Sequence, residues 1–412
     1  MMHHQKMFKK MTKTNSINIG VTLGLKEKKE SIWVNGIKMN AIFLVDLLQK
    51  SDKNYNVYLI NTSKINVEDE DFEPAWDTSK YPIYQYNKVS QKTDLLIQLG
   101  TSLGENIIKK FKELPVENLP KRVITYRCGN NYVMEMERAM FKDPKESPPT
   151  TFTFGLNDDI WFVPQQEKQN KHYYDELERV DSKPVPFVWH PMFIEQMVET
   201  LNSYIPYKPK NKPKNVVSLE PNINVVKYTM IPMLAANKIH RQYNSLIDKF
   251  IFSSGDRISK NKTFTSISSK LEIHKDGKLK SAGRYPTPQF LSLFGDIVIS
   301  HQWDNPLNYA YLDCLYMRYP LVHNAYMIQD AGYYYPEFNI EEASSKLLEA
   351  LNNHDNNQEQ YDEKSEKVLS RYLADENPKL ITTYDKLIDS LWNPSQIKDY
   401  NYNWKTNLYY EN

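Results

Sequence analysis

Residues 296–324, DIVISHQWDNPLNYAYLDCLYMRYPLVHN, decide the fold of this chain. The β-branched run at their start predicts a buried strand, and a polar loop follows it. Apolar spacing over 308–317 then predicts a helix that carries Asp313, and Pro320 opens a second short strand. A strand, a helix and another strand in this order indicate parallel pairing, with helices that cover the sheet.

The same alternation extends outward through both halves of the chain. Short apolar runs with β-branched residues predict strands, and 3.6-residue spacing predicts the helices between them. In the C-terminal half we expect strands at 215–219, 250–253, 271–274, 296–300 and 320–322, and helices at 232–243, 288–294, 308–317 and 340–352. In the N-terminal half we expect strands at 17–23, 56–61, 94–99, 122–126 and 159–163, and helices at 36–50 and 105–114.

Two such alternations predict an α/β fold with two Rossmann-like domains facing a central cleft. A stretch of three prolines and four lysines, YIPYKPKNKPKN, separates them and is typical of a linker. The expected division is a disordered tail at 1–16, an N-terminal acceptor domain at 17–203, a linker at 204–215, a donor-nucleotide domain at 216–380, and a C-terminal helix and tail at 381–412 that packs back on the N-terminal domain.

Composition limits the class of protein. A chain of 412 residues with 40% hydrophobic residues can build two cores. Its 52 basic and 51 acidic side chains give no electrostatic footprint for duplex nucleic acid. The two cysteines form no disulfide framework, and neither a signal peptide nor a membrane span is found. These features predict a cytoplasmic protein, or one of the host cytoplasm if the source is viral.

The order of elements in 296–324 resembles the donor half of GT-B glycosyltransferases. That family has a strand, an acidic Gly-rich loop, a helix with a second acid, and a turn into Pro-Val-Val. Counting back from Pro320 places the second acid, which binds the donor ribose, on Asp313. The first acid falls on Asn305, and the loop glycines fall on Pro306 and Asn308. The alternative for Asp313 is a side chain that caps or solvates the helix.

A second stretch, 218–239, SLEPNINVVKYTMIPMLAANKI, resembles the first strand, loop and helix of the same donor domain. The resemblance implies that Lys227 and Asn222 contact the donor diphosphate. A cation and helix N-terminal amides stabilise the leaving diphosphate without a metal. The alternative for Lys227 is a solvated lysine. The remaining donor-binding residues implied are Trp303, Asn305, Asn308, Asp313 and His323.

The catalytic group is expected at the end of the strand 296–300. His301 follows that strand directly, and Asp304 lies in the next loop. A histidine at a strand end is suited to act as a general base, although structural histidines are commoner. No HExxH or CxxC spacing occurs, so we expect no metal, and no cofactor besides the nucleotide-sugar co-substrate.

Acceptor or phosphate contacts are expected from the N-terminal half. Asn35 and Gly36 precede the helix at 36–50, where GT-B enzymes face the cleft, although Asn-Gly is also an ordinary turn. A polar loop after the strand at 122–126 supplies further candidates, with an ordinary surface loop as the alternative. They are Arg127, Asn130, Asn131 and Tyr132.

Across 17–391 the sequence is similar to an uncharacterised family of glycosyltransferase-like bacterial and viral proteins. The shared strings are SIWxNGIxxNA, EPNxxVxK, SHQWxNxLNYxYxD, YPLVHN and DAGxYYP. The resemblance implies a hexosyl- or pentosyltransferase that acts on a hydroxyl of a glycan, a protein or a modified nucleobase, as a monomer or homodimer. A non-catalytic nucleotide- or glycan-binding protein and a nucleotide-sugar epimerase stay open as alternatives.

Overall fold

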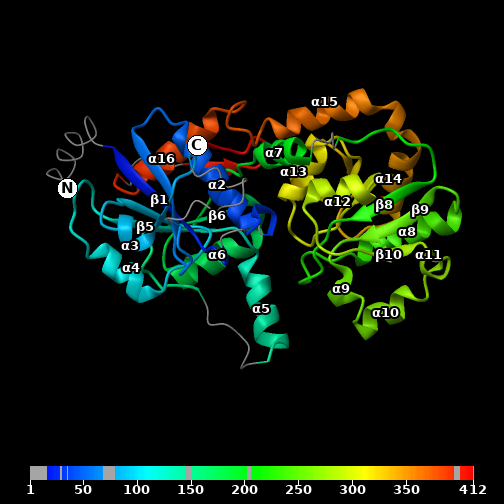
Figure 1. The fold of residues 1–412 in the computed structure, drawn as a ribbon, viewed down its shortest axis with the longest axis horizontal. Coiled ribbons are helices and arrows are strands. Elements are labelled where there is room, and N and C mark those ends of the chain that lie inside the picture. Colours follow the sequence, from blue (N-terminus) through cyan, green and yellow to red (C-terminus); the bar gives the residue numbers. More distant parts are fainter. Residues whose placement is uncertain are drawn as a thin grey trace. The chain divides into compact units, whose positions relative to one another are not determined.

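The computed structural model describes residues 16–27, 30–34, 36–67, 79–143, 151–201, 206–393 and 400–411. Contacts divide the chain into two compact units (Figure 1). Unit 1 comprises Met1–Trp189 and Tyr372–Asn412, and unit 2 comprises His190–Arg371. The division thus precedes the expected linker at 204–215, and the chain returns to unit 1 before residue 381. The expected disordered tail, apart from Ser16, lies outside the described residues.

Unit 1 is built on a seven-stranded sheet in which all described pairs are parallel. The strand order is β3-β2-β1-β4-β5-β6-β7. Its centre is nearly continuously apolar, as expected of strands covered on both faces. The strands are β1 (Ile17–Leu23), β2 (Tyr55–Asn61), β3 (Ile83–Gln85), β4 (Leu95–Gln98), β5 (Arg122–Arg127), β6 (Asp159–Phe162) and β7 (Lys183–Pro184).

The helices of unit 1 connect these strands. The first of them, α2, is buried along most of its length, because it is apolar on nearly every face. The helices are α2 (Gly36–Gln49), α3 (Tyr86–Val89), α4 (Glu105–Lys112), α5 (Asn131–Phe141), α6 (Glu167–Glu178) and α16 (Lys379–Ser390), with 3-10 turns at Ile32–Val34 and Pro164–Gln166.

The end of the chain belongs to unit 1. Tyr384 on α16 is fully buried, its ring meets Trp161 at 5.8 Å, and its hydroxyl donates to the carbonyl of Pro186 at 2.7 Å. A hairpin of β14 (Tyr400–Asn403) and β15 (Leu408–Glu411) follows. Asn407 exchanges two hydrogen bonds with the backbone of Phe187. The last segment therefore closes the core of unit 1.

Unit 2 is built on a six-stranded sheet whose described pairs are again all parallel. The strand order is β10-β9-β8-β11-β12-β13. Counted within the unit, this is the order 3-2-1-4-5-6 of doubly wound folds. The strands are β8 (Lys214–Ser218), β9 (Ile247–Phe252), β10 (Leu279–Ser281), β11 (Ile297–Ile299), β12 (Leu321–His323) and β13 (Tyr333–Tyr334).

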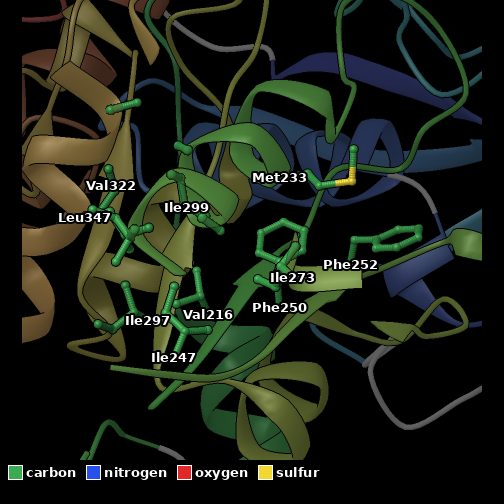
Figure 2. Close-up of a cluster of buried hydrophobic side chains, with 14 of the residues drawn as sticks. Val216, Met233, Ile247, Phe250, Phe252, Ile273, Ile297, Ile299, Val322 and Leu347 are labelled. Atoms are coloured by element: carbon green, nitrogen blue, oxygen red, sulfur yellow. The ribbon is translucent and has the colours of Figure 1, made fainter. Parts of the chain in front are cut away.

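The core of unit 2 lies between its sheet and its helices. Figure 2 shows side chains of β8, β9, β11 and β12 meeting Met233, Ile273 and Leu347 from three helices. The helices of unit 2 are α7 (Met192–Leu201), α8 (Met230–Gln242), α9 (Gly255–Ile258), α10 (Lys262–Ser268), α11 (Glu272–Lys275), α12 (Thr287–Phe294), α13 (Tyr309–Tyr316), α14 (Ile340–Asn353) and α15 (Gln358–Leu369), with 3-10 turns at Tyr326–Ile328 and His354–Asn356.

The expected α/β class with two Rossmann-like domains is confirmed by the two sheets, whereas the strand expected at 271–274 is wrong. That segment forms the short helix α11, which places Ile273 in the core. A short apolar run has no periodicity that separates a strand from a buried helical turn. The strand β10 follows it instead.

The described part of the expected linker is packed into unit 2. Tyr207 is 7% exposed, and its amide donates to the carbonyl of Met317 at 2.9 Å. The ammonium of Lys214 is buried between the hydroxyl of Tyr207 at 2.8 Å and a carboxylate oxygen of Asp355 at 2.7 Å. The prolines and lysines of 204–215 predict a linker, and the contacts of Tyr207 and Lys214 could not be predicted because Met317 and Asp355 lie more than 100 positions away in the sequence.

Candidate functional site

Two loops of unit 2 meet at the carboxyl ends of β8 and β11. The strand order reverses between these strands, and open parallel sheets bind ligands at such a point. The amide of Trp303 donates to the carbonyl of Val226 at 2.9 Å. The backbones of Lys227 and Gln302 form an isolated antiparallel β-bridge. The loops share a set of polar residues, named here the switch-point cluster: Glu220, Lys227, Ser300, His301, Gln302, Asn305 and Asn308.

Glu220 lies at the centre of the switch-point cluster. Only 1% of it is exposed, although it is a carboxylic acid. Its Oε1 accepts from the hydroxyl of Ser300, and its Oε2 accepts from Nε2 of Gln302 at 3.1 Å. Burial raises the pKa of Glu220 to about 7, although Ser300, Lys227 and Gln302 lower it. A buried acid that titrates near neutrality at a strand end is a feature of functional sites.

Gln302 connects Glu220 to the rest of the loop. Its Oε1 accepts from the side-chain amide of Asn305 and from Nδ2 of Asn308 at 3.2 Å. Its backbone exchanges two hydrogen bonds with the side chain of Asn324. Asn308 also caps α13, because its Oδ1 accepts from the amide of Ala310 at 3.0 Å. The amide orientation of Gln302 is therefore fixed from both sides.

Lys227 is the cation of the switch-point cluster. Its side chain is half-buried, and no hydrogen bond or ion pair of its ammonium occurs within the described parts of the chain. Burial lowers the pKa of Lys227, the carboxylate of Glu220 raises it, and the nearby charge of Arg284 lowers it. A half-buried ammonium without a bonded partner is suited to an anionic ligand.

The hydrogen bonds of His301 define its tautomer. The phenol of Tyr335 donates its only proton to the carbonyl of Ser300 at 2.8 Å. The phenol oxygen, 3.2 Å from Nδ1 of His301, must then accept from Nδ1–H. Burial lowers the pKa of His301 to about 4, so the ring is neutral at pH 7. Its Nε2 consequently carries a lone pair, is buried, and has no partner among the described residues.

Aromatic rings lie beside His301. The ring of Phe338 is 4.6 Å from that of His301, and the indole of Trp303 is 6.4 Å from Phe338. Trp303 is 42% exposed and Phe338 is 54% exposed, which is unusual for such large apolar rings. The predicted residue Trp303 is thus an exposed ring beside Phe338, which in turn packs on the ring of His301.

Two predicted donor-binding residues are committed to the fold. Asn222, at φ +53°, donates to the carbonyls of Glu220 and Ser253 and accepts from the amide of Thr229. His323 is fully buried, with Nε2 at 2.9 Å from the carbonyl of Ala331. Its Nδ1 accepts from the amide of Ala325 at 3.2 Å. Neither ring nitrogen of His323 has room for a ligand.

The two predicted acids of unit 2 lie in different surroundings. Asp304 is partly exposed and has a φ of +43°, so it forms the tight turn after Trp303. Asp313 is 5% exposed on α13 and so does not decorate a solvated helix face. Between them, Asn305 is 6% exposed and bonded to Gln302. The predicted residues Asp304 and Asn305 thus lie in the loop after β11, whereas Asp313 is buried on α13.

The residues predicted in unit 1 lie at the carboxyl end of β5 and near α6. Arg127 is buried and forms an ion pair with Glu178 at 2.7 Å, which fixes it in the core. Asn130 caps α5, and Asn131 accepts from the hydroxyl of Tyr174. Tyr132 is 43% exposed.

Of the predicted turn before α2, Gly36 is the exposed first residue of the helix. Asn35 lies outside the described residues.

Sequence reasoning missed Glu220 and Gln302 as site residues. Both lie inside stretches that the sequence singled out, EPN and SHQW. Glu220 is the second residue after β8, and Gln302 is the third residue after β11. Both positions lie at the carboxyl end of a strand, where parallel sheets bind ligands. A search for polar residues at that position in both loops is the signal that finds them.

Neither a metal centre nor a membrane-spanning helix occurs among the described residues. No group of three or more His, Cys, Asp or Glu side chains is placed to hold a metal ion there. None of the helices in that part of the chain has the length and apolar character needed to cross a membrane.

Solved structures with the same fold are glycosyltransferases and related sugar enzymes. A glycosyltransferase from Rickettsia africae matches with a TM-score of 0.53 and 11% identity, over 92% of this chain and 100% of that one. A UDP-forming alpha,alpha-trehalose-phosphate synthase from Burkholderia xenovorans matches with a TM-score of 0.52 and 12% identity, over 92% and 100%. The N-terminal domain of Candida albicans trehalose-6-phosphate phosphatase matches with a TM-score of 0.52 and 12% identity, over 92% of this chain and 97% of that one.

The chain spans 57% of the longer S. aureus TarM, with a TM-score of 0.47. The Rickettsia and Burkholderia structures, which match over 92% of the chain, show that the fold is that of the GT-B glycosyltransferases.

Sequence comparison gives the family. No curated protein matches the chain. The model of the family described as "Protein of unknown function (DUF2827)" matches residues 19–388, which is most of the chain. The chain belongs to the DUF2827 family.

Proposed function

We propose that this protein is a glycosyltransferase that moves a sugar from a nucleotide-sugar donor to a hydroxyl acceptor. The observation that carries the proposal is that two groups in adjoining loops, the ammonium of Lys227 and Nε2 of His301, have no hydrogen-bond partner among the described residues. They lie at the ligand edge of the second sheet of a GT-B fold. One group suits a diphosphate, and the other suits a sugar hydroxyl.

Lys227 and the start of α8 are the proposed diphosphate site. Breaking the sugar–phosphate bond leaves negative charge on the diphosphate, and a cation close to it stabilises the transition state. Lys227 precedes α8, a helix of 13 residues whose N-terminus also favours an anion. Arg284 adds positive charge nearby. This arrangement supports transfer in which the protein, without a metal, neutralises the leaving group.

His301 and the turn at Asp304 are the proposed surroundings of the transferred sugar. As a neutral ring, His301 accepts a hydrogen bond through Nε2 and is suited to take a proton from a hydroxyl. The exposed rings of Trp303 and Phe338 offer apolar faces beside it. Asp304 is the second candidate for the catalytic group, since it follows Trp303 in the same loop as His301. A sugar bound here would lie next to the diphosphate at Lys227.

The remaining assignments extend the same proposal. Asp313 on α13 is proposed to hold the donor ribose, and Asn305 and Asn308 to border the donor through their bonds to Gln302. In unit 1, Gly36, Asn131 and Tyr132 are proposed to approach the acceptor. A cytoplasmic location and a glycan, protein or nucleobase acceptor belong to this proposal as well.

A panel of nucleoside diphosphates and nucleotide sugars tests the proposal by thermal unfolding. A ligand at 100 times its dissociation constant stabilises the folded state by about 2.7 kcal/mol. Lys227→Ala removes a charged contact of about 1.5–3 kcal/mol and is expected to weaken binding about 10- to 100-fold. Lys249→Ala, an exposed lysine on β9, is the matched control and is expected to bind normally.

The same panel separates the alternatives. A binding protein without catalysis shifts its unfolding temperature yet releases no nucleoside diphosphate from any nucleotide sugar. An epimerase converts the donor without an acceptor. If no donor shifts the unfolding temperature of the intact protein, the proposal is abandoned.

A further inference from the structure

Glu220 joins the two loops of the switch-point cluster. Its carboxyl bonds to Ser300 and Gln302 on the β11 loop, while its own backbone belongs to the β8 loop. Its backbone carbonyl accepts from Asn222 and Ser253, which fixes the acid in place. Through Gln302 it orients Asn305 and Asn308. A change at this carboxyl therefore reaches Ser300 and Gln302 directly, and Asn305 and Asn308 through Gln302.

The surroundings of Glu220 can accommodate either charge state. When Glu220 is ionised, the hydroxyl of Ser300 donates to it. When Glu220 is protonated, it can donate to Oγ of Ser300, and the Ser300 hydroxyl can turn to the phenol oxygen of Tyr311, 2.9 Å away. The bond from Gln302 reaches the other carboxyl oxygen in both cases. Neither state leaves a buried donor facing another donor.

Lys227 is the charged group that balances Glu220. Around the acid, Tyr311 and Cys314 on α13 and Tyr335 after β13 have pKa values raised well above their usual range by burial, so they are neutral. His301 is neutral because its pKa is lowered to about 4. The charge of Lys227 is thus partly cancelled when Glu220 is ionised and free when Glu220 is protonated.

We propose that Glu220 is a positioning residue whose protonation is coupled to diphosphate binding at Lys227, so that the protein takes up a proton when a nucleoside diphosphate binds. This inference rests on the proposed function, because it places the diphosphate at Lys227. A bound diphosphate repels the carboxylate and makes protonation of Glu220 easier. Thermodynamic reciprocity then requires that a protonated Glu220 strengthens diphosphate binding.

The direction of the pH dependence follows. The pKa of Glu220 is about 7 in the free protein and rises in the complex, so affinity is highest below pH 7 and falls as the pH increases through the two values. A pKa of Glu220 that is one unit higher in the complex than in the free protein corresponds to an affinity about tenfold lower at the alkaline limit than at the acid limit. A residue with a purely structural role changes affinity without this pH profile.

Isothermal titration of the full chain with UDP, GDP and ADP tests the coupling. Titrations at pH 7.5 in two buffers of different ionisation enthalpy give the number of protons taken up. Glu220→Gln mimics the protonated acid, and subtracting its value removes the protonation of the ligand itself. Glu349→Gln changes an exposed acid on α14 and is the matched control. We expect about half a proton more in the wild type and in Glu349→Gln than in Glu220→Gln.

The outcomes separate this inference from the proposed function. Binding with equal proton uptake in the wild type and Glu220→Gln overturns the role of Glu220 and leaves the diphosphate site intact. A pH dependence of affinity that is equal in the wild type and Glu220→Gln belongs to the nucleotide or to another group such as Lys227, and also overturns the inference. Absence of binding by all three nucleotides overturns both. A nucleotide sugar, whose esterified diphosphate has no group that titrates near pH 7, gives a proton count for the wild type alone, so a Glu220→Gln protein that fails to fold still leaves a test.

Discussion

Single residues at the switch-point cluster owe their charge states to burial. His301 is kept neutral, and Tyr335 fixes which of its nitrogens carries the proton. Burial raises the pKa of Glu220 to about 7, and the side chain of Lys227 has no hydrogen bond or ion pair among the described residues. In the proposed transfer, the acceptor, Nε2 of His301, takes a hydrogen bond or a proton from a sugar hydroxyl, and the cation, Lys227, stabilises the leaving diphosphate.

The lone pair of His301 leads to a prediction at this scale. His301→Ala is expected to lower sugar transfer about 100- to 10,000-fold, the usual contribution of a positioned acid or base. Nucleotide affinity should stay within about threefold, because the ring does not contact the diphosphate in our account. Since the pKa of His301 is about 4, wild-type turnover should show no loss from His301 protonation between pH 8 and pH 5. Initial rates across this pH range check the prediction, and an unchanged rate in His301→Ala contradicts it.

Helices and loops place these residues. Asn222 ties the β8 loop to the start of α8, and Asn308 ties the β11 loop to the start of α13. Both loops are therefore anchored to a helix N-terminus by a side chain. Gln302 then joins them through Glu220. The local structure explains why two short loops can hold buried polar groups without losing their hydrogen bonds.

Asn308 both caps α13 and bonds to Gln302, so a matched capping variant can distinguish a loss of stability from a loss of nucleotide binding. Asn308→Ala removes the cap of α13 and a bond to Gln302, so we expect a loss of about 0.5–2 kcal/mol of stability together with weaker nucleotide binding. Asn261→Ala removes a similar cap from α10, where Asn261 accepts from two amides. The control should lose similar stability and no affinity. Denaturant unfolding and titration measure both, and equal affinities in the two variants count against the proposed role.

The sequence predicted regular elements better than it predicted the chemistry. The helix at 340–352 was found within one residue of α14, and the strand at 17–23 matches β1, because periodic apolar residues specify them locally. The buried hydrogen bond between Glu220 and Ser300 could not be predicted, since the two residues lie 80 positions apart in the sequence. His323 suggested a ligand site from its place at a strand end. Its two backbone bonds, which depend on the turn after β12, show a structural role.

At the scale of the whole molecule, the chain forms two units with separate cores. Unit 2 is one continuous segment, and the members of its core cluster lie between Val216 and Leu351. Unit 1 is completed by the C-terminal segment through Tyr384 and Asn407. The stability of unit 1 therefore depends on residues that follow unit 2, whereas the switch-point cluster depends on unit 2 alone.

Tyr384 tests this separation. Tyr384→Ala leaves a cavity beside Trp161 and is expected to destabilise unit 1 by about 3–5 kcal/mol. The stabilisation of unit 2 by a nucleoside diphosphate should persist in this variant. Tyr410→Ala, on the exposed side of the hairpin, should change little. Scanning calorimetry with and without nucleotide checks the result, and loss of the nucleotide response in Tyr384→Ala means that the site needs an intact unit 1.

The most direct test of the central claim is a crystal structure of the protein with the nucleoside diphosphate that binds most tightly. Our account predicts diphosphate oxygens within hydrogen-bonding distance of Nζ of Lys227, beside the start of α8 and the loop that holds His301. A diphosphate bound away from the β8 and β11 loops, or in unit 1 alone, contradicts it.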